Sequence, residues 1–301
     1  MTTDHQLHAQ LIAACEHRGI DPTGARLLHH YSNAIFHLPS QDALVRITVG
    51  TADIDRVQLT QTVTAWLAHS HRFPATAPYR SIEPVRLDGG VVASFWEFHR
   101  QPEMLVYDSA DLAGLLRRLH DIDDTDQPTG LSEWHPLTSL EAALSDDLPE
   151  SVLLAEELLW LKQEIATVRK ELSDIAWELP SGLIHGDAWA GNLLADSHSA
   201  GLLLGDWDWV SLGPREVDLV PTWHAARRYG RDRSWTRHFS DVYGYDLAAS
   251  PGFETLLRMR DFMQLTGPLR HAATQPRYRQ ALRQRLDGIR SGDREEQWKT
   301  M

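Results

Sequence analysis

Apolar and polar residues follow two different spacings along the chain, and the balance between them changes near residue 98. Apolar positions at helical spacing predict helices over residues 5–18 and 53–70. Residues 26–49 and 89–99 are instead rich in β-branched and aromatic side chains and are bounded by proline and glycine, which predicts short antiparallel strands. The first third of the chain therefore predicts a small strand-rich lobe.

After residue 98 the helical spacing prevails. It predicts an amphipathic helix over residues 109–122, two further helical segments within 138–177, and a mostly helical, arginine-rich region after residue 220. Strand-like segments interrupt this region between residues 182 and 209. The whole pattern predicts the α+β class, with a larger helical lobe following the strand-rich one.

Two apolar runs, NLLA (192–195) and LLLG (202–205), are separated by the polar turn DSHSAG, which predicts a β-hairpin. In an antiparallel hairpin the start of the first strand lies beside the end of the second. Asn192 and Asp206 are therefore expected at one edge, with Asp187 in the loop that leads to it. The hairpin brings together oxygen-bearing side chains without any long-range assumption.

This set of residues suits phosphoryl transfer. Mg²⁺ takes one or two protein oxygen ligands and completes its shell with phosphates and water, which predicts Asn192 and Asp206 as metal ligands. Asp187 would orient the acceptor hydroxyl and take its proton, and protein kinases space an Asp and an Asn in the same way. An alternative is a metal-dependent hydrolase built on His185, Asp187 and Asp206, although no second histidine stands at metal-ligand spacing in this segment.

The run HGDAWAGNLL, followed by LLGDWDWVSLGPREVDLV, resembles the catalytic loop and metal-binding segment of the aminoglycoside phosphotransferase and choline kinase superfamily. The resemblance implies a protein-kinase-like, two-lobed α+β fold with a small antiparallel-sheet N-lobe. It also implies transfer of the γ-phosphoryl group of MgATP to a hydroxyl of a small molecule. The implied segments are the nucleotide-binding lobe (1–97), the helical lobe (98–301), the catalytic loop (183–194), the metal-binding segment (202–209) and a helical substrate-binding insert (132–178).

By the same resemblance, Asp187 matches the catalytic base, and Asn192 and Asp206 match the metal ligands. His185 matches a structural position of the catalytic loop, and Asp218 matches a residue that braces this loop by hydrogen bonds. An aminoglycoside-like antibiotic, an amino sugar and an amino alcohol are all compatible acceptors. The residues do not distinguish among them.

The nucleotide side departs from the usual kinase pattern. The strand ALVRITVG offers Arg46 where many relatives carry lysine, and no lysine precedes Lys162, so the phosphate-binding cation of the first lobe must be arginine or histidine. The turn that should cover the phosphates lacks glycine and offers Ser32 and Asn33. The helix that usually pairs an acid with the strand cation has no glutamate, which leaves the partner of Arg46 open. The backbone around Trp96 and Phe98 is the candidate adenine site.

Three residues are candidates for the acceptor side. Trp189 lies two positions after Asp187, Asp208 follows the metal-binding Asp206, and Trp223 follows Asp218 in the same helical segment. For Asp208 an exposed loop carboxylate is an equally good interpretation, and for Trp223 a core position is the ordinary one.

Composition narrows the partners. The formal charge of −13 disfavours nucleic acid and favours a cationic ligand, and the lone Cys15 fits a reducing compartment. Since no apolar run is long enough for a membrane span, we expect a cytoplasmic protein, monomeric or homodimeric, that acts on a small molecule. The rival hypothesis is a catalytically impaired, nucleotide-binding regulatory protein, motivated by the glycine-free turn and the missing helix acid.

Overall fold

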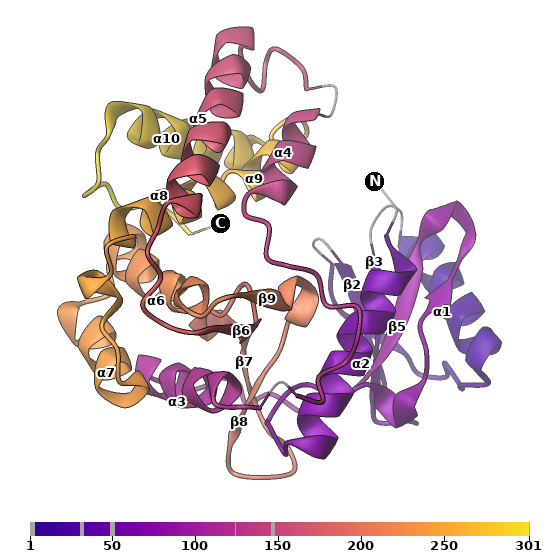
Figure 1. Cartoon of the computed structure of the whole chain (residues 1–301). Coiled ribbons are helices and arrows are strands. Elements are labelled where there is room, and N and C mark those ends of the chain that lie inside the picture. Colours follow the sequence, from indigo (N-terminus) through magenta and orange to yellow (C-terminus); the bar gives the residue numbers. More distant parts are fainter. Residues whose placement is uncertain (1–3, 31–32, 49–51, 124, 146–147, 301) are drawn as a thin grey trace. The chain divides into compact units, whose positions relative to one another are not determined.

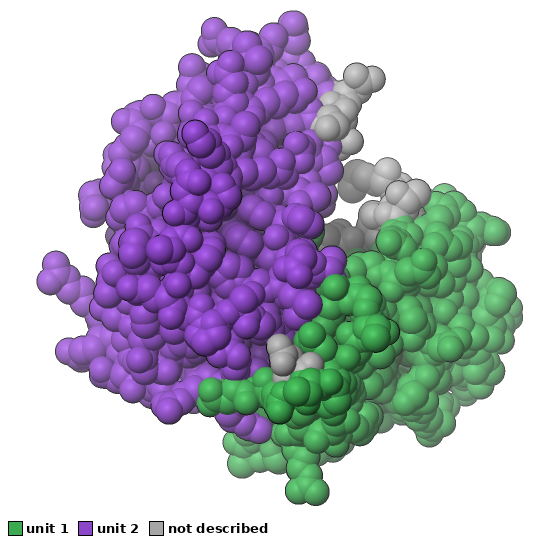
Figure 2. Space-filling view, viewed as in Figure 1, with its two compact units in different colours: residues 1–106, 121–131, 191–210 green, residues 107–120, 132–190, 211–301 purple. Residues whose placement is uncertain are grey.

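The computed structural model describes residues 4–30, 33–48, 52–123, 125–145 and 148–300. The chain forms two compact units (Figure 2). Unit 1 comprises residues 1–106, 121–131 and 191–210, and unit 2 comprises residues 107–120, 132–190 and 211–301. The predicted metal-binding segment 202–209 is part of unit 1, whereas the sequence interpretation grouped it with the helical lobe from residue 98 onward.

Unit 1 is built on a five-stranded antiparallel sheet in the order β1-β2-β3-β5-β4, with α1 packed against β3 and α2 against β5 (Figure 1). The predicted helices and strands of this part of the chain are confirmed. Their bounds are α1 (Asp4–Arg18), β1 (Arg26–His30), β2 (Asn33–Leu38), β3 (Ala43–Thr48), α2 (Ile54–Ser70), β4 (Val85–Arg86) and β5 (Val92–Glu97).

The two faces of the sheet have different surroundings because side chains alternate along each strand. On β3, Ala43, Val45 and Ile47 are buried in one hydrophobic core with α1. The residues between them, Leu44 and Arg46, lie on the opposite face and line a cavity. One face of the sheet therefore packs in the hydrophobic core, and the other face borders a cavity that can hold a ligand.

The predicted hairpin is present in unit 1. Strands β7 (Leu193–Ala195) and β8 (Leu202–Leu204) pair antiparallel, with Leu193 opposite Leu204. Each strand is one residue shorter than predicted at the open end, where the Gly205 N–H donates to the Asn192 carbonyl at 2.9 Å. The hairpin is joined to residues 74–76 by two backbone hydrogen bonds, one made by the N–H of Leu204 and one by its carbonyl.

Unit 2 is mainly helical, as predicted, and contains one short antiparallel pair, β6 with β9 (Figure 1). The α+β class is therefore confirmed. No helix among the described residues has the length and apolar content that crossing a membrane requires. The bounds are α3 (Ser109–His120), α4 (Thr138–Ser145), α5 (Ala155–Ser173), β6 (Ser181–Ile184), β9 (Ser211–Pro214), α6 (Glu216–Tyr229), α7 (Arg233–Tyr243), α8 (Phe253–Met263), α9 (Thr266–His271) and α10 (Pro276–Ser291).

Candidate active site

A cavity of about 430 Å³ lies within unit 1, on the face of the sheet that α1 does not cover. Four of the residues predicted for nucleotide binding line it, namely Asn33, Arg46, Trp96 and Phe98, and so does Asp206. The rest of its wall is largely apolar and includes Leu28, Ile35, Leu44 and Leu194. Ser32 lies outside the described residues. The cavity combines an apolar wall with a cation and a carboxylate, as sites for small charged ligands commonly do.

Arg46 projects from β3 into this cavity and is held by Asp208. Its guanidinium forms a bidentate ion pair with the carboxylate: Nη1 lies 2.7 Å from Oδ1, and Nη2 donates to Oδ2. Burial by itself lowers the pKa of Arg46, but the carboxylates of Asp208 and Asp206 outweigh burial and raise this pKa above its ordinary value. A fully charged guanidinium therefore stands at the cavity.

The structure answers the question of the acidic partner that the sequence left open. The partner of Arg46 comes from the segment after β8 and not from α2. Helix α2 supplies a cation instead, since Arg56 donates to the carbonyls of Asp208 at 2.8 Å and Val210 at 2.6 Å. Gln61, at one of the helix positions where an acid was sought, donates to the Phe95 carbonyl at 3.0 Å. No spacing rule points to Arg56 or to the Arg46–Asp208 pair.

Two backbone N–H groups at the end of β5 already have carbonyl partners within unit 1. The Glu97 N–H donates to the Ala77 carbonyl at 3.0 Å, and the Phe98 N–H donates to the Asp42 carbonyl at 3.3 Å. The Phe98 ring stacks on His37 with 3.8 Å between centroids. An adenine bound in this cavity would therefore have to form its hydrogen bonds with other backbone groups of this segment.

Asn192 and Asp206 flank the open end of the β7–β8 hairpin. Asn192 is 9% exposed and Asp206 is exposed, and both belong to unit 1. Asp206 has φ +60° and ψ +55°, the left-handed conformation that few residues other than glycine adopt and that costs about 1 kcal/mol or more. Both side chains offer hard oxygen donors, which fits Mg²⁺ and not a soft metal.

Asp187 lies in unit 2, in the loop after β6, and binds Arg260 of α8. Arg260 Nη1 is 2.6 Å from Asp187 Oδ1, and the two side chains are 10% and 24% exposed. Sequence reasoning missed Arg260, because its helix lies far along the chain and no motif marks it. The ion pair fixes the orientation of the carboxylate predicted to be the base.

The loop that carries Asp187 is braced by the buried Asp218 of α6. The Asp218 carboxylate accepts hydrogen bonds from the backbone N–H groups of His185 and Gly186, each at 2.7 Å, and it contacts His120 Nε2 at 3.1 Å. Gly186 has φ +83°, which favours glycine at this turn. The His185 ring accepts from the Asp187 N–H at 3.3 Å. These contacts set the loop conformation from a fully buried anchor.

The two tryptophans proposed for the acceptor side have different environments. Trp189 is 49% exposed, close in sequence to Asp187 and in the same unit. Trp223 is 6% exposed and packs edge-on against Phe239 with centroids 5.3 Å apart, as a core residue does. The geometry therefore favours Trp189 over Trp223 as a contact for a ligand.

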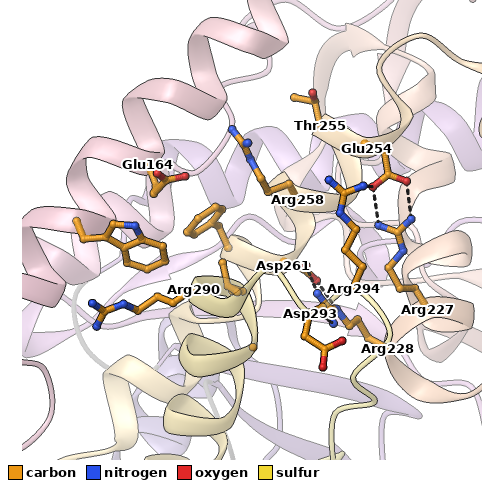
Figure 3. Close-up of a pocket in the computed structure, with 15 residues that line it drawn as sticks. Glu164, Arg227, Arg228, Glu254, Thr255, Arg258, Asp261, Arg290, Asp293 and Arg294 are labelled. Atoms are coloured by element: carbon orange, nitrogen blue, oxygen red, sulfur yellow. Dashed lines mark hydrogen bonds and ion pairs between the residues drawn. The ribbon is translucent and has the colours of Figure 1, made fainter.

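A second cavity of about 350 Å³ lies within unit 2 and is lined by arginines and acids of α5, α6, α8 and the C-terminal segment (Figure 3). Glu254 binds Arg227 and Arg294, and Asp261 binds Arg228, so each of these charged groups has a partner of opposite sign. Residues 254, 255, 258, 261 and 262 of α8 line it. At about 100° per residue, this face of α8 is opposite to Arg260. Neither Arg260 nor Asp187 is among the residues that line this second cavity.

Residues 61–263 match the family profile described as the phosphotransferase enzyme family. The match covers more than half of the chain and includes Asp187, Asn192 and Asp206, whereas Asn33 and Arg46 precede it. The chain belongs to the phosphotransferase enzyme family. No curated protein matches the chain.

Solved structures of small-molecule kinases share the fold. A microcompartment-associated aminopropanol kinase aligns with a TM-score of 0.67 and 16% identity, covering 95% of each chain. A choline/ethanolamine kinase family protein from Mesorhizobium loti aligns with a TM-score of 0.58 and 20% identity, covering 97% of this chain and 94% of that one. A spectinomycin phosphotransferase in complex with ADP and spectinomycin aligns with a TM-score of 0.58 and 16% identity, covering 95% and 93%. At these identities the likeness shows the fold, and the family match supports a small-molecule phosphotransferase.

Proposed function

We propose that this protein transfers the γ-phosphoryl group of MgATP to a hydroxyl of a small, cationic acceptor. The observation that carries the proposal is Asp187: a carboxylate on a loop fixed by the buried Asp218, oriented by Arg260, in a chain of the phosphotransferase enzyme family. No comparison favours the rival hypothesis of an impaired regulatory protein.

The nucleotide is assigned to the unit 1 cavity. Its apolar wall suits a purine base, and Arg46 supplies a permanent positive charge for the phosphates. Asp208 keeps this guanidinium in place, a task that a helix glutamate performs in protein kinases. The spectinomycin phosphotransferase of similar fold was solved with ADP, which agrees with an adenine nucleotide here.

Asn192 and Asp206 are the residues proposed to hold Mg²⁺. Both present oxygen atoms at the open end of one hairpin, and the backbone bond between Gly205 and Asn192 fixes that end. When bound, the ion neutralises charge on the phosphates. The left-handed backbone of Asp206 is consistent with a residue kept for a task other than stability.

In the reaction the acceptor hydroxyl oxygen bonds to the γ-phosphorus, the bond from that phosphorus to the β,γ-bridging oxygen breaks, and ADP leaves. The hydroxyl proton passes to Asp187, whose orientation toward the acceptor is set by Arg260. The chemistry depends mainly on positioning and on charge stabilisation.

The acceptor class follows from charge and from relatives. The net charge of −13 attracts cations through the summed field, and the similar structures are described as kinases of aminopropanol, of choline or ethanolamine, and of spectinomycin. All of these names denote compounds that carry both amino or ammonium groups and hydroxyls. We therefore assign the acceptor to the amino alcohols and amino sugars, with the exposed Trp189 as a candidate contact for its cationic group.

The test is ATP consumption by the purified protein with Mg²⁺ across a panel of amino alcohols, amino sugars and aminoglycosides. We expect one acceptor class to stimulate ADP release, and Asp187→Asn to reduce kcat at least a hundredfold while the thermal unfolding midpoint and ADP binding are kept. Stimulated turnover that survives in Asp187→Asn would overturn the role of Asp187. Absence of Mg²⁺-dependent nucleotide binding would overturn the kinase assignment itself.

A further inference from the structure

Three side chains with metal-binding atoms lie together in unit 1. Glu97 ends β5, His99 follows two residues later, and His198 lies in the β7–β8 turn. One ligand atom from each lies within 4.8 Å of the ligand atoms of the other two. Across the part of the chain that the structure describes, no other group of His, Cys, Asp or Glu side chains converges in this way.

The two segments that supply these side chains are held against each other by Gln101. Its amide Nε2 donates to the carbonyls of His99 at 2.8 Å and Ala195 at 3.2 Å. Its Oε1 accepts from the Ala195 N–H at 2.9 Å. Gln101 therefore fixes the position of the backbone after β5 relative to the first hairpin strand without any metal.

His99 has the surroundings of a metal-ligating histidine. It is 8% exposed, and its Nδ1 lies 3.4 Å from Oδ1 of Asp196. The Ser197 N–H donates to the same Nδ1 at 3.3 Å, so the proton of the neutral ring is on Nε2. A metal bound at Nε2 would move this proton to Nδ1, where the Asp196 carboxylate can accept a hydrogen bond from it. A carboxylate behind the ligating imidazole is the usual arrangement at protein zinc sites.

Asp196 also sets the turn that carries the third ligand. Its carboxylate accepts from the His198 N–H at 2.9 Å and from Ser199 Oγ at 2.6 Å. The His198 ring, which is exposed, lies with its centroid 5.2 Å from that of His99. One aspartate thus orients one imidazole and places the other.

We propose that Glu97, His99 and His198 form a binding site for a zinc-type divalent cation. Two imidazoles and one carboxylate are a recurrent protein ligand set for Zn²⁺, with water in the fourth position, whereas Mg²⁺ prefers oxygen ligands. Bond lengths near 2.1 Å place tetrahedral ligand atoms about 3.4 Å apart. The ligand atoms here lie within 4.8 Å of one another, and rotation of the exposed His198 side chain can shorten this separation while the buried His99 stays in place.

The site would clamp the segment after β5 to the turn of the hairpin whose other end carries Asn192 and Asp206. Glu97 and His99 also line the unit 1 cavity, so a bound cation would stiffen its wall. Because the folded site binds the ion and the unfolded chain does not present it, the ion stabilises unit 1 by mass action.

The experiment uses the full chain, freed of metal with a chelator and kept in excess Mg²⁺ so that oxygen sites of the magnesium type are saturated. Zn²⁺ is titrated in competition with a chromophoric chelator. We expect one equivalent to bind with a micromolar or tighter Kd, and the thermal midpoint to rise. His198→Ala should weaken binding at least tenfold, and Glu97→Gln should weaken it by a smaller factor.

His198→Cys retains a zinc ligand and should keep the affinity, whereas His135→Ala, an exposed histidine of unit 2, should change nothing. Folding of each variant is checked by its circular dichroism and its unfolding midpoint without metal. The proposal is overturned if the wild-type protein binds no Zn²⁺ under these conditions. It is also overturned if His198→Ala binds Zn²⁺ as tightly as the wild type.

Discussion

Two arginines form ion pairs with candidate functional aspartates, one pair in each unit. Arg46 binds Asp208 in unit 1, and Arg260 binds Asp187 in unit 2. The pairs differ in exposure, since the Asp208 side chain is 40% exposed and the Asp187 side chain 24%. At the scale of single residues, Asp208 holds the Arg46 guanidinium and Arg260 orients the Asp187 carboxylate, and each pair can be tested separately.

Arg260→Ala should lower kcat by roughly 10- to 100-fold, because a hydrogen bond to a charged group contributes about 1.5–3 kcal/mol and its loss frees Asp187 to rotate. Arg260→Lys should recover part of the rate, since lysine keeps the charge but not the planar donors. The measurement is steady-state turnover with the acceptor at saturation.

Arg258→Ala is the matched control for Arg260. Arg258 lies on the opposite side of α8 and pairs with Glu171 at 2.8 Å, away from Asp187. Its replacement should leave kcat within about twofold, as is usual for a partly exposed ion pair. Equal losses in both variants would show that α8 is merely destabilised and that Arg260 has no specific role.

Asp208→Asn should raise the Kd for ADP with Mg²⁺ about 3- to 10-fold, because Arg46 loses the carboxylate that holds it at the cavity. The effect is modest since the Asp208 side chain is 40% exposed. Asp42→Asn, a change at a 72% exposed carboxylate in the β2–β3 turn, is the control for altered net charge. Tighter ADP binding by Asp208→Asn would mean that Asp208 competes with the phosphates for Arg46, against the positioning role.

At the scale of elements, the conformation of the loop that follows β6 depends on contacts with the first turn of α6. Asp218 belongs to that turn, is fully buried, and accepts two backbone N–H groups of the loop. On its other side His120 links it to Tyr243, which His120 Nδ1 contacts at 2.7 Å. Helices α3, α6 and α7 are thus connected to the conformation of one short loop.

Asp218→Asn should destabilise the loop by about 1–3 kcal/mol, because the amide offers one acceptor oxygen where two N–H groups need one each. The measurement is hydrogen exchange of the His185 and Gly186 amides, which should speed up relative to amides in α5. Unchanged exchange at these two amides would show that other contacts hold the loop. Thr255→Val, at a half-buried position of α8 whose hydroxyl lies 3.4 Å from Glu171, is the control.

The sequence predicted those features that depend on local periodicity. The β-branched residues of ALVRITVG predicted the strand that carries Arg46, and the two apolar runs predicted the hairpin that joins Asn192 to the Asp206 end. The partners of Arg46 and Asp187 were not predictable, because Asp208 and Arg260 reach them through tertiary packing, for which sequence spacing has no rule. The roles of Asp187, Asn192 and Asp206 remain predictions that activity measurements must test.

At the scale of the whole molecule, a buried arginine of α6 connects α8 and the C-terminal segment within unit 2. Arg228 is 2% exposed, binds Asp261 of α8, and donates to the carbonyls of Asp293 and Glu296 in the C-terminal segment. The Trp298 ring lies under the same guanidinium at 4.6 Å. One arginine of α6 therefore fixes both α8 and the end of the chain.

His224 adds a pH dependence to this arrangement. Burial lowers the pKa of His224 from 6.5 to about 4, although Asp261 at 3.0 Å acts in the opposite direction. The imidazole is therefore neutral in the folded protein at neutral pH. Burial tends to raise the pKa of Asp261, but hydrogen bonds from His224 and Arg228 lower it below 3.8, so this group titrates only in stronger acid.

The sign of the effect follows from proton uptake. Between pH 6.5 and about 4 the unfolded chain protonates His224 and the folded chain does not, so the free energy of unfolding falls as the pH falls through this window. At about 1.4 kcal/mol per pKa unit, the loss from this residue is at most ~3.5 kcal/mol. The expected measurement is a urea unfolding series between pH 7.5 and 4.5, followed by tryptophan fluorescence.

His224→Gln keeps an amide donor for Asp261 and removes the titrating group, so its unfolding free energy should fall less with acid than that of the wild type. The difference between the two curves isolates His224 from the other histidines and carboxylates, which titrate in both proteins. His135→Gln, at an exposed site, should reproduce the wild-type slope. Parallel curves for His224→Gln and the wild type would show that His224 is protonated in the folded state, and that Asp261 outweighs burial at this position.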